Sequence, residues 1–446
     1  MHHRVPACVV AGAGCEDREL GMQATLVLIW LAGLVYFMKR PREVDFLTIG
    51  FFAAALYFLP GLVGYTLSPT TPASPVKLPM QIAPEAYVVM IAVLTANLVG
   101  AIVWDHLQHR PAVNHLVLAK ARSAGDVAFL CGVIGVLMTW VDSGGTAFAA
   151  DKRVVMATVG RWHVLWEMGA SLGVLFAYSF GRRGLLLACM SLLLLDMYIG
   201  FRYAFGITFI ALTALWLARR GRVALASLPK RYAILILLGG LFVISYQNLK
   251  EPLRSNDWTE IGRRLSNPVW YGAGILTSEP FTTQTILNEV IKRDFRTDSS
   301  HLWSASEHLI LFSSSLGAES RRFNDVFQPA LFPLVDHGLA NNIWAQMWSA
   351  GGWPLLSVFI VLHVLVLMGG SYFLRTRDPA LRAGVVLMFS YWAFYVHRNE
   401  LVVQVGLEKQ VLLTWLLCVG AGMLLGGALA SGAPGDKEGH AVGTRG

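Results

Sequence analysis

Long apolar segments separated by short polar connections dominate the hydrophobic pattern of this chain. Their length is close to the roughly 20 residues that a helix needs to cross a bilayer, and they lack the alternation of a half-buried strand. Hydrocarbon cannot hydrogen-bond an exposed backbone, which favours helices throughout. The pattern predicts an all-α polytopic membrane protein with about eleven transmembrane helices, near 22–38, 44–65, 86–104, 126–141, 163–180, 184–200, 203–218, 232–248, 353–374, 382–397 and 411–430.

One long polar stretch interrupts this series and divides the chain. The predicted parts are an N-terminal helix bundle, a large outer loop, a C-terminal group of helices and a Gly-rich disordered tail, at 1–248, 249–340, 341–430 and 431–446. Apolar residues recur at helical spacing over 281–291 and 303–312, which predicts amphipathic helices lying on the membrane surface. The loop is where a substrate from the solvent side can be handled.

Composition supports the membrane class and excludes several others. The chain has 446 residues, of which 55% are apolar and only 14% charged, and this is too apolar for a soluble globule. The five cysteines are scattered without a CxxC motif, which predicts neither a disulfide framework nor a zinc site. There is no basic stripe for nucleic acid and no motif for ATP or a metal, so we expect no nucleic-acid partner and no cofactor.

Basic residues are distributed unequally between the two sets of connections. The richer set comprises the connections near 39–45, 105–125, 181–184, 219–231 and 375–381. The positive-inside rule makes this set cytoplasmic. The long loop then faces the outside, because long translocated loops escape the charge rule.

The loop closes with Asp336-His337-Gly338-Leu339-Ala340-Asn341-Asn342, directly before an apolar segment. An imidazole of ordinary pKa, about 6.5, accepts a proton at neutral pH, so His337 is a candidate general base. Asp336, Asn341 and Asn342 are candidates for orienting it or for binding substrate. The alternative is structural, with Asp336 or an asparagine capping the next helix and His337 at the interface.

Arg202 lies in a turn that joins two apolar segments almost without a loop. An arginine so close to hydrocarbon is costly unless it meets water, a carboxylate or an anionic ligand, and its planar guanidinium suits phosphate oxygens. The alternatives are an interfacial anchor and an ion pair with Asp196, a carboxylate within an apolar segment that itself needs a partner.

Further cations stand on the predicted outer side. Arg153 and Arg161 precede an apolar segment that contains Glu167, and they are candidates for binding a phosphate-bearing substrate. Simple solvation of a loop explains them equally well. His363 and the run 397–400 favour packing and interfacial roles.

These features together resemble the O-antigen polymerase and ligase superfamily, and its oligosaccharide repeat-unit polymerases more closely than its ligases. The resemblance lies in the many spans, the late outer loop, Gly200-Phe201-Arg202, and the run from His337 to Asn342 followed by Gly351-Gly352. It implies a GT-C-like, metal-independent, inverting glycosyltransferase in the bacterial inner membrane, with a periplasmic active site. The implied partners are undecaprenyl-pyrophosphate-linked oligosaccharides, membrane lipids and a chain-length regulator.

The resemblance also implies roles for the candidates. A sugar hydroxyl would attack the anomeric carbon of the growing chain with His337 as base, while Arg202, helped by Arg153 or Arg161, stabilises the leaving pyrophosphate. The product would be an O-antigen, capsule or exopolysaccharide. Two alternatives remain: a ligase that transfers the glycan to lipid A-core, and a transporter or flippase, which would explain Asp196 and Glu167 but not the long loop.

Overall fold

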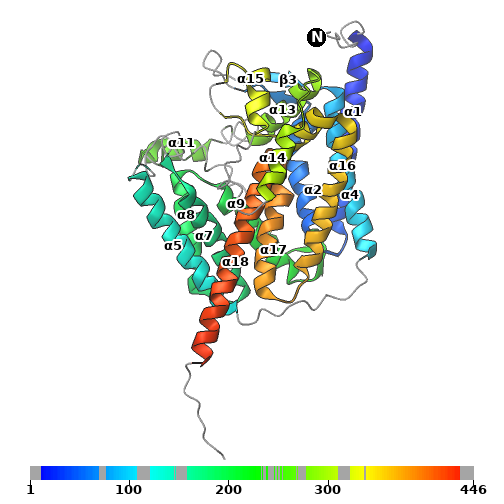
Figure 1. The fold of residues 1–446 in the computed structure, drawn as a ribbon. Helices are drawn as coiled ribbons and strands as arrows, with labels where there is room; N and C mark the ends of the chain where they lie inside the picture. The colour runs from blue at the N-terminus through cyan, green and yellow to red at the C-terminus, as the bar shows by residue number, and fades with distance from the viewer. Residues whose placement is uncertain are drawn as a thin grey trace, which may run out of the picture.

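The protein is a bundle of long helices, and several shorter helices lie at one end of it (Figure 1). The structure, a computed structural model, describes residues 12–69, 77–107, 121–144, 146, 158–232, 255–267, 269, 278–309, 322–335 and 338–431, with isolated positions between 234 and 253. The first half contains α1 Gly12–Lys39, β1 Arg42–Glu43, α2 Phe46–Tyr57, α3 Leu59–Val63, β2 Tyr65–Leu67, β3 Pro79–Gln81, α4 Pro84–Leu107, η2 Ala121–Ser123, α5 Ala124–Ser143, α7 Arg161–Ser179, α8 Arg183–Ile199, α9 Tyr203–Ala218, β4 Arg222–Val223 and η4 Leu225–Ser227. The second half contains α11 Trp258–Ser266, α13 Glu279–Lys292, α14 Ser300–Leu309, α15 Asn324–Leu331, α16 Ile343–Leu374, α17 Pro379–Ser390, the π-turn η6 Tyr391–Tyr395, η7 Val396–Arg398 and α18 Leu401–Ser431.

Several of these helices are membrane spans by length and composition. Within the described residues, six are long and apolar enough to cross a bilayer, in the regions Arg18–Lys39, Pro84–Leu107, Ala121–Ser143, Ile343–Leu374, Pro379–Arg398 and Leu401–Gly426. Helices α2 and α9 are apolar but shorter. Most of the predicted interval 232–248 and the tail 432–446 lie outside the described residues. The structure therefore confirms a helical multi-pass membrane protein, whereas the count of eleven stays a prediction.

The connections predicted to be cytoplasmic meet at one end of the bundle. Strand β1 pairs with β4 in antiparallel register, Arg42 opposite Val223, and this joins the connection after α1 to the connection after α9. The guanidinium of Arg42 is 2% exposed and lies 2.9 Å from Asp45 and 3.1 Å from Asp105. Asp45 also caps α2 by accepting from the amide of Thr48. The alternation of the predicted spans put these connections on one side, and the β1–β4 pairing confirms this for 39–45 and 219–231.

Helix α13 contradicts the prediction of a helix on the membrane surface over 281–291. Nearly all its residues are buried, and their polar groups bond the β2–β3 hairpin at the end of the bundle opposite β1–β4. The Asn288 side chain accepts from the amide of Ala83 at 2.7 Å and donates to the carbonyl of Gln81 at 3.0 Å. Thr285 donates to the carbonyl of Leu67 at 2.6 Å. The prediction was wrong because helical spacing reveals an apolar face but not that a hairpin would cover the polar one.

Other boundaries also shift, for local reasons. Helix α16 begins ten residues before the predicted 353 because Asn342 caps it, and Gly352 breaks its regular geometry inside the span. The predicted span 44–65 is divided into α2 and α3 at Phe58, directly before Leu59 and Pro60. Helix α14 covers part of the predicted 303–312, packs against α18 and leaves Trp303 68% exposed, as an interfacial helix would.

Close packing of α5 on α7 fixes the helix that carries several buried polar groups. Glycines make the approach possible: a Cβ on Gly135 would lie 2.3 Å from the amide nitrogen of Trp166. A Cβ on Gly169 would lie 2.6 Å from the amide nitrogen of Gly132. Small residues of this kind let membrane helices meet backbone to backbone. Helix α7 is thereby held with its His163 and Glu167 face toward α8 and α9.

Candidate functional site

A cavity of about 300 Å³ lies at the end of the bundle that carries α13 and the β2–β3 hairpin. Its walls come from the turn between α8 and α9, the start of α13, the segment before α16 and the end of the α17 region. The lining residues are Lys77, Gly200, Phe201, Arg202, Tyr203, Glu279, Thr282, Ala340, Tyr395 and Arg398. Three of them carry cationic side chains and one a carboxylate, so the lining has an excess of positive charge.

A tight turn places Arg202 in this cavity. Helix α8 ends at Gly200, whose φ of 114° is left-handed and favours glycine. The amides of Gly200 and Phe201 donate to the carbonyls of Met197 and Asp196 at 3.0 and 3.1 Å, and α9 begins directly after Arg202. The Arg202 side chain is 28% exposed and lies 3.9 Å from a carboxylate oxygen of Glu279.

Arg398 is held more rigidly than Arg202. Its Nε lies 2.6 Å from Oε1 of Glu279, its Nη1 donates to Oε2 at 2.8 Å, and its guanidinium stacks 4.6 Å from the centre of the Tyr395 ring. One carboxylate therefore orients two guanidinium groups toward the same space. Partial burial of both side chains lowers the pKa of Arg202 and of Lys77. An anionic ligand would stabilise them.

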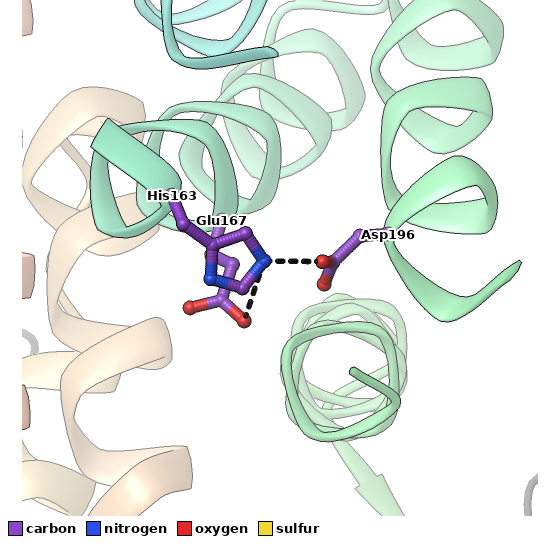
Figure 2. Close-up of side chains that lie close together, drawn as sticks. All are labelled: His163, Glu167 and Asp196. Carbon is purple, nitrogen blue, oxygen red and sulfur yellow. Dashed lines mark hydrogen bonds and ion pairs between the residues drawn. The ribbon is translucent and has the colours of Figure 1, made fainter. Parts of the chain in front are cut away.

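A second group of polar side chains lies inside the bundle beside the same turn (Figure 2). His163 and Glu167 stand one helical turn apart on α7, and Asp196 faces them from the last turn of α8. Nε2 of His163 lies 2.7 Å from Oδ1 of Asp196 and 3.7 Å from Oε1 of Glu167. Tyr203 of α9 donates its hydroxyl to the other oxygen of Glu167. We call His163, Glu167 and Asp196 the buried triad.

The buried triad and the cavity share the α8–α9 turn. The ring of Phe201 lies 4.3 Å from that of His163, and Tyr203, which bonds Glu167, also lines the cavity. Asp196 thus finds its partner in His163, whereas Arg202 reaches Glu279. The ion pair between Arg202 and Asp196 that the sequence left open is therefore not formed, because each residue has another partner.

The structure places the other predicted residues differently from one another. Asn342 is buried and caps the N-terminus of α16. Its side chain accepts from the amides of Trp344 and Ala345 and donates to the carbonyl of Thr283. Its polar atoms are thus occupied within the fold, as in the structural alternative. The amide of Asn341 donates to the carbonyl of Arg398 at 3.0 Å, which ties this segment to the cavity.

Of the remaining predicted residues, the structure describes only Arg161, and it does not line the cavity. Arg161 is the exposed first residue of α7 and is absent from the cavity lining. Arg153, Asp336 and His337 lie outside the described residues. Ala340, close after His337 in the chain, does line the cavity.

Sequence reasoning missed Lys77, Glu279 and Arg398 as cavity residues, and it took Arg398 for an interfacial residue. Only the fold shows that the start of α13 meets the end of the α17 region, because 119 residues separate Glu279 from Arg398. The buried triad carried one readable signal, the spacing of four between His163 and Glu167, which puts both on one helix face. Comparisons with models of protein families, with curated proteins and with solved structures find no match for this chain.

Proposed function

We propose that this protein is a glycosyltransferase that polymerises undecaprenyl-pyrophosphate-linked oligosaccharide repeat units into a bacterial surface polysaccharide. In this proposal the chain has about eleven spans and a GT-C-like arrangement, and it works at the periplasmic face of the inner membrane. The observation that carries the proposal is the cationic cavity at the end of the bundle. Pyrophosphate at a membrane surface concentrates negative charge, and guanidinium groups bind phosphate oxygens through parallel hydrogen bonds.

The chemistry follows from the position of the cations. The sugar hydroxyl of an incoming repeat unit forms a bond to the anomeric carbon of the growing chain while the bond from that carbon to the pyrophosphate oxygen breaks. His337 takes the hydroxyl proton, and attack opposite the leaving group inverts the anomeric configuration. Arg202 and Arg398 stabilise the negative charge that develops on undecaprenyl pyrophosphate. In this scheme Arg398 and Lys77 replace Arg153 and Arg161 as the supporting cations, because they line the cavity with Arg202.

Fixed side chains can stabilise the charge on the leaving pyrophosphate without a free divalent ion because they are preorganised. Glu279 holds Arg398 with two short contacts and Arg202 with a longer one, so the guanidinium groups need little reorientation when charge develops. Glu279 neutralises only part of the charge of three cations. The remainder is available to the leaving group.

The test uses lipid-linked repeat units extracted from cells in which the gene is deleted, where single repeats would accumulate. Purified protein in lipid vesicles should convert them to a ladder of polymers and release undecaprenyl pyrophosphate, with chelator present and without added Mg²⁺ or Mn²⁺. His337→Ala and His337→Gln should both abolish the ladder at normal protein abundance, because neither can accept the proton. A full ladder from the Gln variant would remove His337 as the base.

The same assay separates the two alternative functions. Transfer that occurs only when lipid A-core is added would identify a ligase. The buried carboxylates of the triad favour the transporter alternative, and movement of intact lipid-linked repeats across the vesicle bilayer without polymer would establish it. Either result would overturn the polymerase proposal.

A further inference from the structure

The geometry points to a divalent metal ion of the zinc class bound by His163, Glu167 and Asp196, inside the bundle and apart from the cavity. Among the described residues, these three offer one ligand atom each, all within 4.8 Å of one another. Figure 2 shows the same ring nitrogen of His163 directed at both carboxylates. None of the three lines the cavity, so the ion would not be a ligand of the sugar substrate.

With both carboxylates ionised, the buried triad carries an excess of negative charge that a cation would balance. Glu167 and Asp196 are both 0% exposed and His163 is 4% exposed. In the described part of the chain, Glu167 and Asp196 form ion pairs only with His163. The single positive charge of one imidazolium cannot balance two carboxylates. An isolated buried carboxylate costs several kcal/mol even after relaxation. A divalent ion neutralises both at once.

Unused ligand atoms point in the same direction. Within the described residues, Oε1 of Glu167 and Oδ2 of Asp196 are buried without a hydrogen-bond partner. Buried polar atoms are mostly paired in native proteins, so these two neighbouring oxygens mark a place for a proton shared by the carboxyls or for a cation. Oε1 of Glu167 lies 3.7 Å from Nε2 of His163, on the side where an ion shared with His163 would sit. An ion would use the atoms that the protein leaves unpaired.

The donor set selects the class of ion. One imidazole nitrogen with two carboxylate oxygens is typical of zinc and related transition metals, whereas Ca²⁺ and Mg²⁺ prefer all-oxygen sites. Ligands held at about 2.1 Å can be at most about 4.2 Å apart, so the triad needs to close by roughly half an ångström. The ion would take the place of the proton now shared by Nε2 of His163 and Asp196, and that proton would pass to solvent.

Tyr203 would orient the site from outside the ligand set. Its hydroxyl bonds the Glu167 oxygen that does not face His163, the kind of contact that holds a metal-binding carboxylate in place. The carbonyl of Asp196 accepts from the amide of Phe201, next to Arg202. A bound ion would therefore stiffen the α8–α9 turn and hold the cavity wall.

The experiment measures metal rather than polymer, so its failure leaves the proposed function untouched. Wild-type protein purified through a tag without histidine should contain about one transition-metal ion per chain by mass spectrometry. After removal of the ion with phenanthroline, added Co²⁺ should give the visible absorption of a low-symmetry site.

Variants of matched shape then locate the ion. Asp196→Asn and Glu167→Gln should lower Co²⁺ affinity at least 100-fold, and Tyr203→Phe by about 10–100-fold. Glu408→Gln, which changes a carboxylate of α18 outside the buried triad, should bind as wild type does. Wild-type protein that neither contains a transition metal nor binds Co²⁺ would overturn the inference even if the variants fail to fold. Unchanged affinity in Asp196→Asn would overturn it as well.

Discussion

Single residues decide the chemistry of the cavity through a shared carboxylate. Glu279 lies 2.6 Å from Arg398 but 3.9 Å from Arg202, so the two guanidinium groups are not equivalent. Arg398 is fixed by the ion pair and the Tyr395 ring, which leaves it little freedom to change partner. Arg202 is held more loosely by this carboxylate, and it is therefore the group best able to turn toward an incoming phosphate.

Replacing Arg202 with Lys tests whether the guanidinium shape matters. Lysine keeps the charge but loses the two parallel donors, so polymerisation should fall about 10²–10³-fold, which corresponds to roughly 2.7–4 kcal/mol of transition-state stabilisation. Initial rates with lipid-linked repeats measure this. The matched control is Arg161→Lys, an exposed arginine outside the cavity lining, which should keep nearly the full rate. Equal rates for the two variants would exclude Arg202 from pyrophosphate binding.

Glu400 gives a prediction about pH. It lies between the spans, is 0% exposed and accepts from the amide of Phe323, and burial raises its pKa from 4.5 to about 7. A raised carboxyl pKa means that the fold favours the neutral form. The contribution of Glu400 to stability is thus complete below about pH 4.5 and lost as pH rises through about 7.

Glu400→Gln should remove this pH dependence, because glutamine imitates the neutral carboxyl. The Tm of the variant minus that of wild type should increase between about pH 5 and about pH 8.5. The corresponding change in the free energy of unfolding has a limit near 3 kcal/mol for a pKa shift of this size. Thermal unfolding in detergent at both pH values measures the difference. If the Tm difference between variant and wild type is the same at both pH values, Glu400 is not buried in its neutral form.

Among the elements, α16 shows how a span accommodates a break. Pro354 cannot donate an amide hydrogen and Gly352 adopts φ 62°, ψ −153°, so the helix changes direction inside the span. The carbonyls exposed by the break find partners in the segment after α13: Nη1 of Arg296 donates to Trp348 at 2.8 Å, and the amide of Thr297 donates to Ser349 at 3.0 Å. The break thus fastens this segment to the first part of α16.

Gly352→Ala should destabilise the protein. Its backbone conformation is essentially restricted to glycine, at a cost of about 1–3 kcal/mol for another residue. An added Cβ would also lie 3.1 Å from Nη1 of Arg296. Gly369→Ala on the same helix is the control: no atom lies within 4 Å of its added Cβ, and alanine is the better helix former. Thermal unfolding should show a lower Tm for the first variant and an unchanged or higher one for the second.

At the scale of the whole molecule, the sequence predicts what depends on periodicity and charge. Apolar segments predicted the positions of most helices, and the alternation of those segments predicted that the connections 39–45 and 219–231 lie at the same end. Contacts between distant segments were not predictable: nothing local to Glu279 indicates Arg398, and nothing local to Asn288 indicates the hairpin at Gln81. Arg202 was identified because the free-energy cost of a charged side chain in hydrocarbon can be inferred from the sequence alone. The same cost indicated that Asp196 needs a partner, but it could not identify His163 as that partner.

Orientation in the membrane is the prediction that tests the whole arrangement. The experiment starts from a variant in which Cys8 and Cys15 are replaced by serine. Its other native cysteines, Cys131, Cys189 and Cys418, are buried in the structure. A membrane-impermeant thiol reagent added to intact cells should then label Ser299→Cys and spare Ser227→Cys, both at exposed positions near opposite ends of the bundle. Lysed cells should label both. The reverse pattern in intact cells would invert the topology and place the cavity in the cytoplasm.

The burial of α13 bears on how the specificity of this protein can change. If the proposed function holds, a loop that only rested on the membrane could be exchanged as a unit together with its preference for a sugar. Helix α13 instead supplies the hydrogen-bond partners of the β2–β3 hairpin and the carboxylate that orients Arg398. A transplanted 249–340 segment would leave those groups unmatched unless its own hairpin came too. New specificity is therefore accessible through substitutions around the cavity, made one at a time in the resident framework.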